Sequence, residues 1–355
     1  MAKDLQYRGL VNMGEFIPRA LTQGLFYSDI MRTLEKIDSD ASWCAEWRKT
    51  AEEHERQGRE ALEKGRNLTA GQALFRAALC YHFAQFLYFE DIPTKLGTIA
   101  QSAQCYRDGM KFFLPPAQSV EIPFEGISLA GFFRLPSGAT KSPCMISING
   151  TDGAKLEFFA LEANFLNRGI ATLCFDGPGQ GETWAKMKLR TDYEKATAAA
   201  VDFLSRHPAI DSVRIGVAGV SFGGHLSVRS ACHDPRIKAC IAVAGFYETS
   251  YYDWNDSLRR IRFQYLCGTQ DLSEAKKAAA GFDLSGRLRN LKAPLLVIHG
   301  RRDRTTPCSQ GERIYAEAPG PKWMEIYEDG DHCCHNIPYK THPLMADWAS
   351  EILRG

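Results

Sequence analysis

Three residues in the second half of the chain have the types and the order needed for nucleophilic catalysis. Ser221 lies in the segment Gly219-Val220-Ser221-Phe222-Gly223-Gly224, which follows the apolar run RIGVA and opens a predicted helix. A serine between a strand and a helix, with small residues two positions before and after it, is typical of a nucleophile elbow. The structural alternative is a glycine-rich strand–helix turn with an incidental serine. The presence of partner residues argues against that alternative.

A serine hydroxyl is a weak nucleophile and needs a base. Asp303 stands in the pattern Gly300-x-x-Asp303-x-x-x-Pro307 after the apolar run LLVIHG, and His332 follows the next apolar run and a DGD turn. The order serine, acid, histidine is the one that this architecture uses. We predict that Asp303 fixes the tautomer of His332 and stabilises its cation. His332 would take the serine proton and return it to the leaving group.

Other residues compete for the two partner roles. Asp303 could be a solvated loop acid among arginines, and Asp271 is a weaker rival because it does not follow a strand. His335 and His342 compete with His332 for the role of the base. We favour His332 because it lies closest to the end of the preceding strand.

The segment EDGDHCCHN, residues 328–336, also suggests a metal or redox site. Zinc ligands usually occur at spacings such as Cys-x-x-Cys, which the adjacent Cys333 and Cys334 do not match. Neighbouring cysteines rarely bridge each other without strain. We therefore predict no metal and no cofactor, and interpret both cysteines as packing or pocket-lining residues. His335 stays open between a substrate-pocket residue and an ordinary histidine at a helix start.

An oxyanion hole needs N–H donors aimed at the developing negative charge. We expect one from the backbone of Phe222 and a second from the loop after the first long strand, at Gly150 or Thr151. Asp152 in the same loop is an auxiliary carboxylate candidate, although negative charge beside an oxyanion hole is unfavourable. It could hold the protonation state of the histidine, protonate a leaving group, or be a solvated turn residue.

Two further segments bear on the pocket. FDGPGQGE, residues 175–182, lacks the Gly-Lys-Ser/Thr ending of a phosphate loop, so we interpret it as a structural loop that shapes the pocket floor. A group of aromatic residues begins a predicted insertion directly after a strand and provides the substrate-pocket candidates. These are Tyr247, Tyr251, Tyr252 and Trp254.

Ser221, Asp303 and His332 need parallel strands to bring them together, and the sequence indicates such strands after residue 118. The apolar strand-like runs are residues 142–150, 169–182, 213–225, 238–246, 293–303 and 322–332, and the helical segments are residues 155–167, 191–206 and 222–232. This alternation predicts an α/β fold with a mostly parallel sheet and helices on both faces. Residues 118–136 indicate a leading antiparallel hairpin, and residues 247–290 a helical insertion before the acid-bearing strand.

Before residue 118 the patterns are almost entirely helical. Residues 40–65 carry a stripe at three- and four-residue steps, Thr69 and Gln72 resemble a capping box, and the apolar run 73–89 predicts a buried helix. Paired prolines then end the helical region. We predict an N-terminal helical domain over residues 1–117 and a catalytic domain over residues 118–355.

The composition excludes several classes of partner. The 355 residues include 43 basic and 42 acidic residues, so the electrostatic attraction that nucleic acids require is absent. The charged N-terminus argues against a signal peptide, and no window approaches the ~18 apolar residues of a membrane span. Eleven cysteines without an export signal indicate reduced thiols. We expect a cytoplasmic protein with a small-molecule ketone or ester substrate and no nucleic-acid or membrane partner. The apolar helices are compatible with a homodimer.

The motifs GVSFGG, GRRDRTTP and DGDH resemble, in order and spacing, the α/β-hydrolase superfamily of serine hydrolases over residues 118–355. The helical N-terminal domain, RGIATLCFDGPGQGE, DYEK and HCCHN resemble a narrower group. That group includes 2,6-dihydroxypseudooxynicotine hydrolase and fungal polyketide-shortening hydrolases of the yellowish-green pigment type.

This resemblance implies cleavage of a carbon–carbon bond beside a ketone, in aryl ketones or 1,3-diketones, by a triad of Ser221, Asp303 and His332. It also implies that the N-terminal helices cover the substrate and that a carboxylate assists the histidine. The resemblance also implies that a glutamate has this role in the nicotine-pathway relative, and the matching position here is Asp152, a shorter carboxylate. Two alternatives stay open: an ester, lactone or thioester hydrolase or acyltransferase with the same residues, and a binding protein on the same scaffold.

Overall fold

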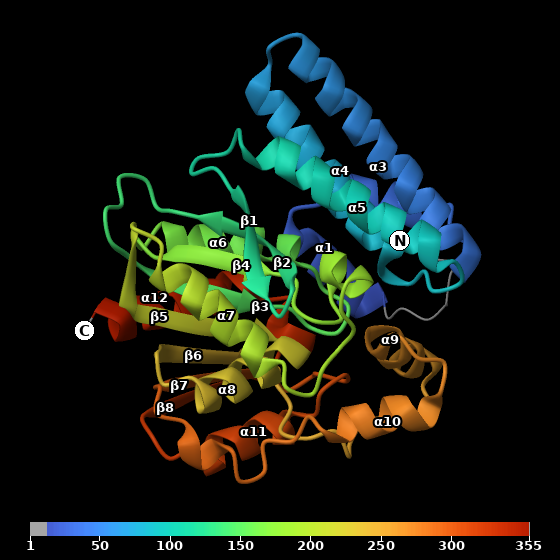
Figure 1. Cartoon of the computed structure of the whole chain (residues 1–355). Helices are drawn as coiled ribbons and strands as arrows, with labels where there is room; N and C mark the ends of the chain where they lie inside the picture. Colours follow the sequence, from blue (N-terminus) through green and yellow to red (C-terminus); the bar gives the residue numbers. More distant parts are fainter. Residues whose placement is uncertain (1–12, 355) are drawn as a thin grey trace. The chain divides into compact units, whose positions relative to one another are not determined.

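A computed structural model describes residues 13–354 of the 355-residue chain. Most of the segment on which the prediction of no signal peptide rests, residues 1–12, lies outside the described part. The chain divides into two compact units, with the boundary after Gln118 (Figure 1). In its described residues the first unit is helical, with α1 (Met13–Gln23), α2 (Tyr27–Leu34), α3 (Asp40–Glu63), α4 (Asn67–Phe86) and α5 (Ile92–Met110).

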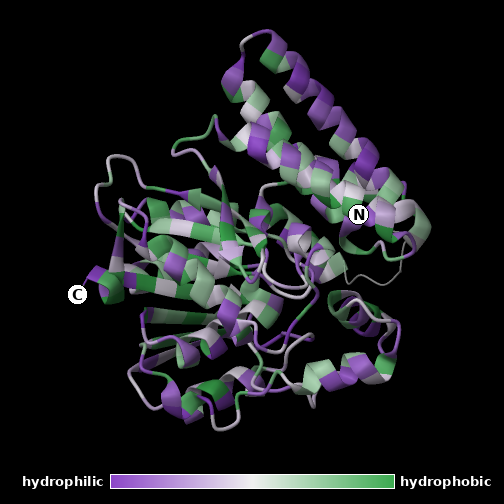
Figure 2. Cartoon of the chain, viewed as in Figure 1, coloured by the Kyte–Doolittle hydropathy of each residue, from purple (hydrophilic) through white to green (hydrophobic). Residues whose placement is uncertain are grey.

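Helix α4 forms the centre of the first unit. From Ala73 to Phe86 all its residues except Arg76 are buried, and α4 packs against both α3 and α5. This confirms the predicted buried helix. By contrast, α3 is mostly hydrophilic along the side shown in Figure 2.

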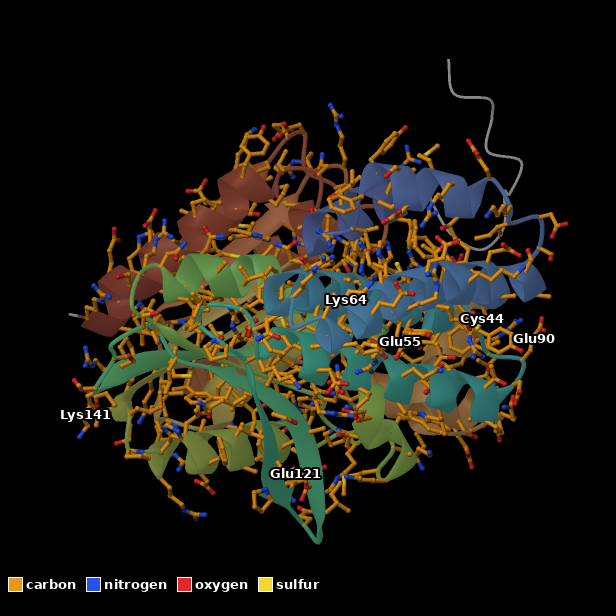
Figure 3. The ribbon with its side chains drawn as sticks, turned by 90° about the horizontal axis from the view of Figure 1, so that it is seen from above. Cys44, Glu55, Lys64, Glu90, Glu121 and Lys141 are labelled. Carbon is orange, nitrogen blue, oxygen red and sulfur yellow. The ribbon has the colours of Figure 1, made fainter. Side chains whose placement is uncertain are left out.

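A polar network ties the three long helices of this unit together. Glu55 of α3, labelled in Figure 3, accepts a hydrogen bond of 2.9 Å from the Tyr81 hydroxyl of α4. Arg59 pairs with Glu55 at 3.1 Å and with Asp108 of α5 at 2.7 Å. The network therefore links α3 to α4 and to α5.

The capping box predicted at Thr69 and Gln72 is wrong. Helix α4 already begins at Asn67, so Thr69 lies inside its first turn. Gly65, with a φ of +68°, ends α3 and lets the chain re-enter a helix almost at once. No extended residue is therefore left at Thr69 to act as an N-cap.

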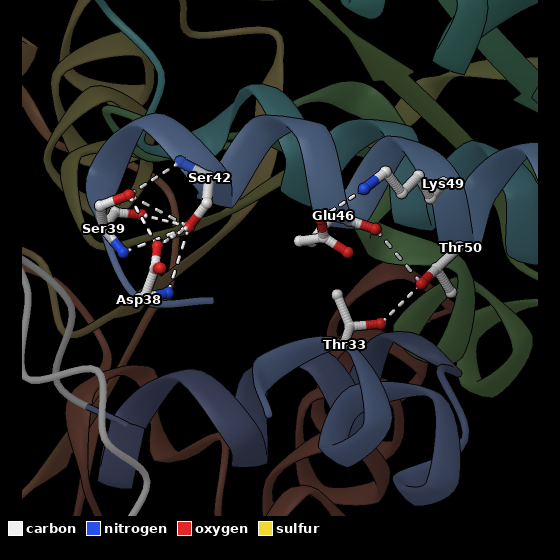
Figure 4. Close-up of polar contacts among 7 residues, drawn as sticks. All are labelled: Thr33, Asp38, Ser39, Ser42, Glu46, Lys49 and Thr50. Carbon is white, nitrogen blue, oxygen red and sulfur yellow. Dashed lines mark hydrogen bonds and ion pairs between the residues drawn. The ribbon is translucent and has the colours of Figure 1, made fainter. Parts of the chain in front are cut away.

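A capping box starts α3 instead. The Ser39 hydroxyl accepts from the Ser42 N–H at 3.3 Å, and the Ser42 hydroxyl accepts from the Ser39 N–H at 3.2 Å (Figure 4). Further along α3, the Thr50 hydroxyl meets that of Thr33 on α2 at 2.6 Å. These contacts set where α3 starts and how α2 lies against it.

The second unit contains a sheet in the order β1-β2-β4-β3-β5-β6-β7-β8. Its strands are β1 (Gln118–Phe124), β2 (Ile127–Arg134), β3 (Ser142–Ile148), β4 (Ala171–Phe175), β5 (Ile210–Val220), β6 (Ile237–Val243), β7 (Leu295–Gly300) and β8 (Lys322–Tyr327). β2 pairs antiparallel with β4, whereas the pairs from β4 through β8 are parallel. Glu125 and Gly126, both with positive φ, turn β1 into β2, as expected for a tight hairpin. The predicted mostly parallel sheet with a leading hairpin is confirmed.

Helices cover both faces of the sheet. The helices of this unit are α6 (Phe159–Leu166), α7 (Glu194–Ser205), α8 (Phe222–His233), α9 (Ser257–Cys267), α10 (Leu272–Ala280), α11 (Cys308–Glu317) and α12 (Pro338–Arg354), with 3₁₀ turns η1 (Lys155–Phe158), η2 (Gly181–Ala185), η3 (Leu288–Asn290) and η4 (His332–Cys334). Two separate cores result, one with α7, α8 and α11 and one with α6 and α12. Alternate strand residues face alternate cores, as for Ala242 and Val243 of β6.

Helices α9 and α10 occupy the segment between β6 and β7 that the sequence predicts as a helical insertion. The insertion is anchored over the start of α8, because Phe263 and Phe282 pack on Phe222 with ring centroids 6.2 Å and 4.8 Å apart. Within residues 13–354, no helix has the length and apolar character needed to cross a bilayer.

Candidate functional site

Ser221 occupies a sharp turn between β5 and α8. Its φ of 56° and ψ of −121° lie outside the regions that L-residues favour, which costs about 1–3 kcal/mol. The turn depends on two glycines. A Cβ at Gly219 would lie 2.0 Å from the Gly223 carbonyl oxygen, and a Cβ at Gly223 would lie 2.0 Å from the Ile148 carbonyl oxygen. The predicted strand–turn–helix around Ser221 is therefore present.

The structure brings Ser221, His332 and Asp303 into one chain of hydrogen bonds. His332 Nε2 lies 3.0 Å from Ser221 Oγ, and His332 Nδ1 lies 2.8 Å from Asp303 Oδ2. The three residues follow β5, β7 and β8, whose carboxyl ends meet at one edge because the strands run parallel. Since a carboxylate only accepts, Nδ1 carries the proton in the neutral form of the ring, and Nε2 is then left to accept from the serine hydroxyl.

The Asp303 carboxylate is fully buried and surrounded by donors. Its Oδ1 accepts from the N–H groups of Thr305 and Thr306, each at 2.8 Å. Its Oδ2 also lies 3.4 Å from Nε2 of the buried His299. Burial by itself raises the pKa of Asp303. The charge of His332 and the hydrogen bonds from His299, His332 and Thr306 outweigh that effect and hold the pKa well below its usual 3.8.

The imidazole of His332 is biased toward its cation. Desolvation lowers its pKa, but the neighbouring Asp303 and Cys333 raise it, and the balance lies well above 6.5. The positive charge that forms when His332 takes a proton is thus stabilised in place. Cys333 and Cys334 are buried, in agreement with a packing role, and both have positive φ. Among residues 13–354, no group of three or more His, Cys, Asp or Glu side chains could hold a metal ion.

The rival residues lie elsewhere. Asp271 is the exposed N-cap of α10, where its carboxylate accepts from the Ser273 N–H at 2.7 Å. His335 follows η4, before the start of α12, and is partly buried. His342 lies inside α12, and desolvation lowers its pKa to about 4.

The loop after β3 adjoins the nucleophile. A Cβ at Gly150 would lie 3.4 Å from Ser221 Cβ, so the backbone of the predicted oxyanion loop reaches the serine. Thr151 and Asp152 follow and are partly buried. Phe222 supplies the first N–H group of α8, one of the amides that a helix leaves without a partner inside itself. The predicted donors thus come from two segments that meet at Ser221.

Asp152 forms an ion pair with Arg262 of α9, with 3.1 Å between Oδ2 and the guanidinium. Only 15% of the Asp152 side chain and 17% of the Arg262 side chain are exposed. Asp152 is therefore not the solvated turn residue that we considered. The pair connects the predicted oxyanion loop to the helical insertion.

Comparisons with known proteins identify the family of this chain. A family model described as esterase FrsA-like matches residues 35–308. The 2,6-dihydropseudooxynicotine hydrolase of Paenarthrobacter nicotinovorans is 34% identical over 337 residues, which cover 94% of this chain and 91% of that protein. The chain belongs to the FrsA-like esterase family.

Further matches agree with this FrsA-like assignment. The crystal structure of 2,6-dihydroxy-pseudo-oxynicotine hydrolase matches with a TM-score of 0.88 at 33% identity and covers 95% of both chains. The 20-hydroxy-prefusarin hydrolase of Gibberella moniliformis is 34% identical over 239 residues, which are 63% of this chain and 57% of that protein. The α/β-hydrolase fold with its N-terminal helical region and the assignment as a hydrolase are thereby confirmed.

The predicted pocket residues of this FrsA-like hydrolase differ from one another in burial and in their contacts. Tyr247 is 1% exposed, and its hydroxyl donates to Glu317 of α11 at 2.6 Å, so it is part of the hydrophobic core. Tyr251 is partly buried, with its hydroxyl 3.5 Å from that of Thr306 in the Asp303 loop. Burial raises the pKa of Tyr251 to about 12.

Tyr252 and Trp254 form an aromatic group on the insertion of the FrsA-like hydrolase. Their ring centroids are 4.9 Å apart, and both rings pack against Phe263. The Tyr252 hydroxyl donates to the Arg259 carbonyl at 3.0 Å. These contacts pack the two rings against α9, the helix that also contains Arg262, the partner of Asp152.

Sequence reasoning does not single out His299, Arg262 and Gln180, which contact Asp303, Asp152 and Gly150 of the candidate site. His299 stands four residues before Asp303 and could have been noticed from that spacing. Gln180 lies in FDGPGQGE, where the sequence predicts a structural loop and no particular role for the glutamine. Arg262 has no local signal, because its partner is far away in the chain.

Proposed function

We propose that this hydrolase cleaves a carbon–carbon bond beside a ketone, with Ser221 as nucleophile, His332 as base and Asp303 as its orienting acid. The observation that supports the proposal most directly is the hydrogen-bond chain through these residues, at 3.0 Å and 2.8 Å. The resemblance of the motifs implies the same chemistry. The hydrolase from Paenarthrobacter, which matches over nearly the whole chain, belongs to that group.

In the proposed reaction, His332 Nε2 accepts the proton of Ser221 as Oγ attacks the ketone carbon. The N–H groups of Phe222 and of the Gly150–Thr151 segment stabilise the negative oxygen of the adduct. The adduct collapses to a serine ester, and the electron pair of the broken bond goes to the leaving carbon. A neighbouring carbonyl or hydroxyaryl group spreads that charge, and the imidazolium protonates the carbon.

The second half of the reaction returns the enzyme to its starting state. His332 accepts a proton from water, whose oxygen attacks the ester carbonyl, and the same N–H groups stabilise the second adduct. When this adduct collapses, Ser221 regains the proton from His332 and the carboxylic acid leaves. One water molecule is consumed, and the products are an acid and a shortened ketone or an arene.

Asp152 contributes through its charge. A cation at 3.1 Å favours the ionised carboxylate, which cannot donate a proton. Of the roles considered for Asp152, support of the imidazolium of His332 therefore fits the ion pair better than protonation of the leaving group. Pairing with Arg262 also reduces the penalty of a carboxylate close to the oxyanion.

A product-identified screen tests the proposal. Aryl ketones and 1,3-diketones are offered beside 4-nitrophenyl esters, lactones and thioesters, and products are identified by mass spectrometry. The wild-type protein should release an acid and a shortened ketone or arene. Ser221→Ala should lose all turnover and all acylated protein, and persistent turnover by this variant would exclude the serine mechanism.

The second candidate is an esterase or thioesterase that uses the same residues. The matching family model is described as an esterase, which favours this reading. Its leaving group would be an alcohol or a thiol, which the same imidazolium can protonate. Fast turnover of aryl esters together with no action on any diketone would select it.

The proposal also includes the cellular location and the oligomeric state of the enzyme. All eleven cysteines are free thiols, which is compatible with the reducing cytoplasm. Cytoplasmic location, a homodimer and substrate covering by the N-terminal helices stay predictions. Fractionation of cells and the mass of the purified protein in solution test the first two.

A further inference from the structure

The side chain of Gln180 reaches across to the loop after β3. Its amide nitrogen donates to the carbonyl oxygens of two successive residues, Asn149 at 2.9 Å and Gly150 at 3.0 Å. Gln180 is 2% exposed, so these bonds form away from water. The loop that it holds contains the predicted oxyanion donors.

Only one orientation of the Gln180 amide satisfies its neighbours. The oxygen Oε1 accepts from the Gly177 N–H at 3.2 Å and from the Tyr193 hydroxyl at 2.7 Å. Carbonyl oxygens only accept and an N–H only donates, so a reversed amide would lose at least three bonds. All four bonding positions of the amide are used. Tyr193, fully buried, fixes the side chain from behind.

These bonds set the direction of the backbone N–H groups in the loop. A peptide unit is planar and trans, so its C=O and N–H groups point in opposite directions. The Gly150 carbonyl shares a peptide with the Thr151 N–H, and the Asn149 carbonyl shares one with the Gly150 N–H. Gln180 holds both carbonyls and thereby turns both N–H groups to the opposite side.

The same segment also holds the far end of this loop. Asp176 accepts from the Lys155 N–H at 2.9 Å, and the Lys155 ammonium pairs with Asp176 at 2.6 Å and with Glu182 at 2.7 Å. The loop between Asn149 and Lys155 is therefore fastened at both ends by residues 176–182. The segment FDGPGQGE therefore holds the loop after β3 in place at both ends.

We propose that Gln180, itself held by Tyr193, is a positioning residue that orients the oxyanion donors Gly150 and Thr151 beside Ser221. The inference rests on the proposed function, because it takes Ser221 as the attacking group. Loss of one oxyanion donor typically lowers kcat by about 10²–10³-fold. We expect about 10²-fold for Gln180→Met, which keeps the length of the side chain but removes its hydrogen bonds.

The experiment compares four variants of the full chain with the wild type: Gln180→Met, Tyr193→Phe, Gln310→Met and Ser221→Ala. Tyr193→Phe removes one hydrogen bond behind Gln180 and should lower kcat by about 3–10-fold, less than Gln180→Met, because the amide keeps its bonds to the loop. Gln310→Met is the matched control. Gln310 is also a buried glutamine that holds a loop, accepting from the N–H groups of Tyr247 at 2.8 Å and Glu248 at 3.1 Å.

Two readouts separate positioning from general stability. Turnover of 4-nitrophenyl acetate provides kcat and KM, and 2,2,2-trifluoroacetophenone, which forms a tetrahedral adduct on a reactive serine, provides an inhibition constant. Gln180→Met should lower kcat and weaken the inhibitor by similar factors, with KM changed less than about threefold. Gln310→Met should lower the melting temperature and leave both readouts unchanged.

The outcomes distinguish this inference from the proposed function. An inactive Ser221→Ala beside wild-type kcat and inhibitor affinity in Gln180→Met would overturn the role of Gln180 alone. Full turnover by Ser221→Ala would overturn the proposed function. If Gln180→Met does not fold, Tyr193→Phe decides, because wild-type kcat and inhibitor affinity in that variant would also contradict the inference.

Discussion

Replacement of Asp303 by asparagine tests how the base is held. In the wild type, Oδ1 accepts from the N–H groups of Thr305 and Thr306, both at 2.8 Å, and Oδ2 accepts from His332 Nδ1 at 2.8 Å. An amide has only one oxygen. Because the two backbone N–H groups can only donate, that oxygen should stay with them, and the NH₂ group should face His332.

The consequence for catalysis follows from the tautomer. An NH₂ group donates to Nδ1 of His332, so the ring proton moves to Nε2, which then cannot accept the proton of Ser221. A wrong tautomer of this kind lowers kcat by about 10⁴-fold. This corresponds to about 5.5 kcal/mol of activation free energy, at ~1.36 kcal/mol for each tenfold change.

The assay is kcat with a saturating 4-nitrophenyl ester, together with thermal unfolding to show that Asp303→Asn is folded. Asp271→Asn is the matched control, because Asp271 is an exposed N-cap and asparagine caps a helix equally well. The control should keep kcat within about twofold. A folded Asp303→Asn with kcat within tenfold of the wild type would refute the reasoning, as would loss of activity in Asp271→Asn.

Two further predictions concern charge around the base. His332 must be neutral to act, and its pKa is raised well above 6.5, so kcat/KM should fall as the pH falls, with a midpoint above 6.5 that Asp303→Asn shifts downward. A midpoint below 6.5 in the wild type would contradict this. Asp152→Asn should slow aryl-ketone cleavage by about 10²-fold but 4-nitrophenyl ester hydrolysis by less than threefold, because the leaving carbanion needs a proton from the imidazolium whereas 4-nitrophenolate leaves without one. Asp211→Asn is the control, because it breaks a similar ion pair, with Arg214, at the end of β5 remote from Ser221, and it should change neither rate. Equal effects of Asp152→Asn on both substrates would argue against the proposed role of Asp152.

Local chemistry was readable from the sequence. The spacing of Gly219 and Gly223 around Ser221 predicts the elbow because any side chain there would overlap with backbone atoms 2.0 Å away. The alternation of apolar runs and helical patterns predicts the parallel sheet, since strands buried on both faces need apolar residues throughout. Asp303 and His332 could be named because each follows a strand, and parallel strands end at one edge.

Local patterns were less reliable where competing signals lie close together. Thr69 has the sequence context of an N-cap, but the left-handed Gly65 lets α4 start three residues earlier, with Arg66 in the N-cap position. The position of Tyr247 after a strand predicts a pocket residue, but its ring is buried in the core and its hydroxyl donates to Glu317 of α11. In both cases the neighbours of the residue, and not its type, decide its position.

The sequence by itself determined the order of nucleophile, acid and base and the kind of sheet that carries them. Tertiary structure alone decided which side chains support them: His299 on Asp303, Arg262 on Asp152, and Gln180 on the loop at Gly150. The physical reason is distance along the chain. A hydrogen bond between Gln180 and Gly150, or an ion pair between Arg262 and Asp152, depends on which strands are neighbours and where the insertion packs, and no local period encodes either.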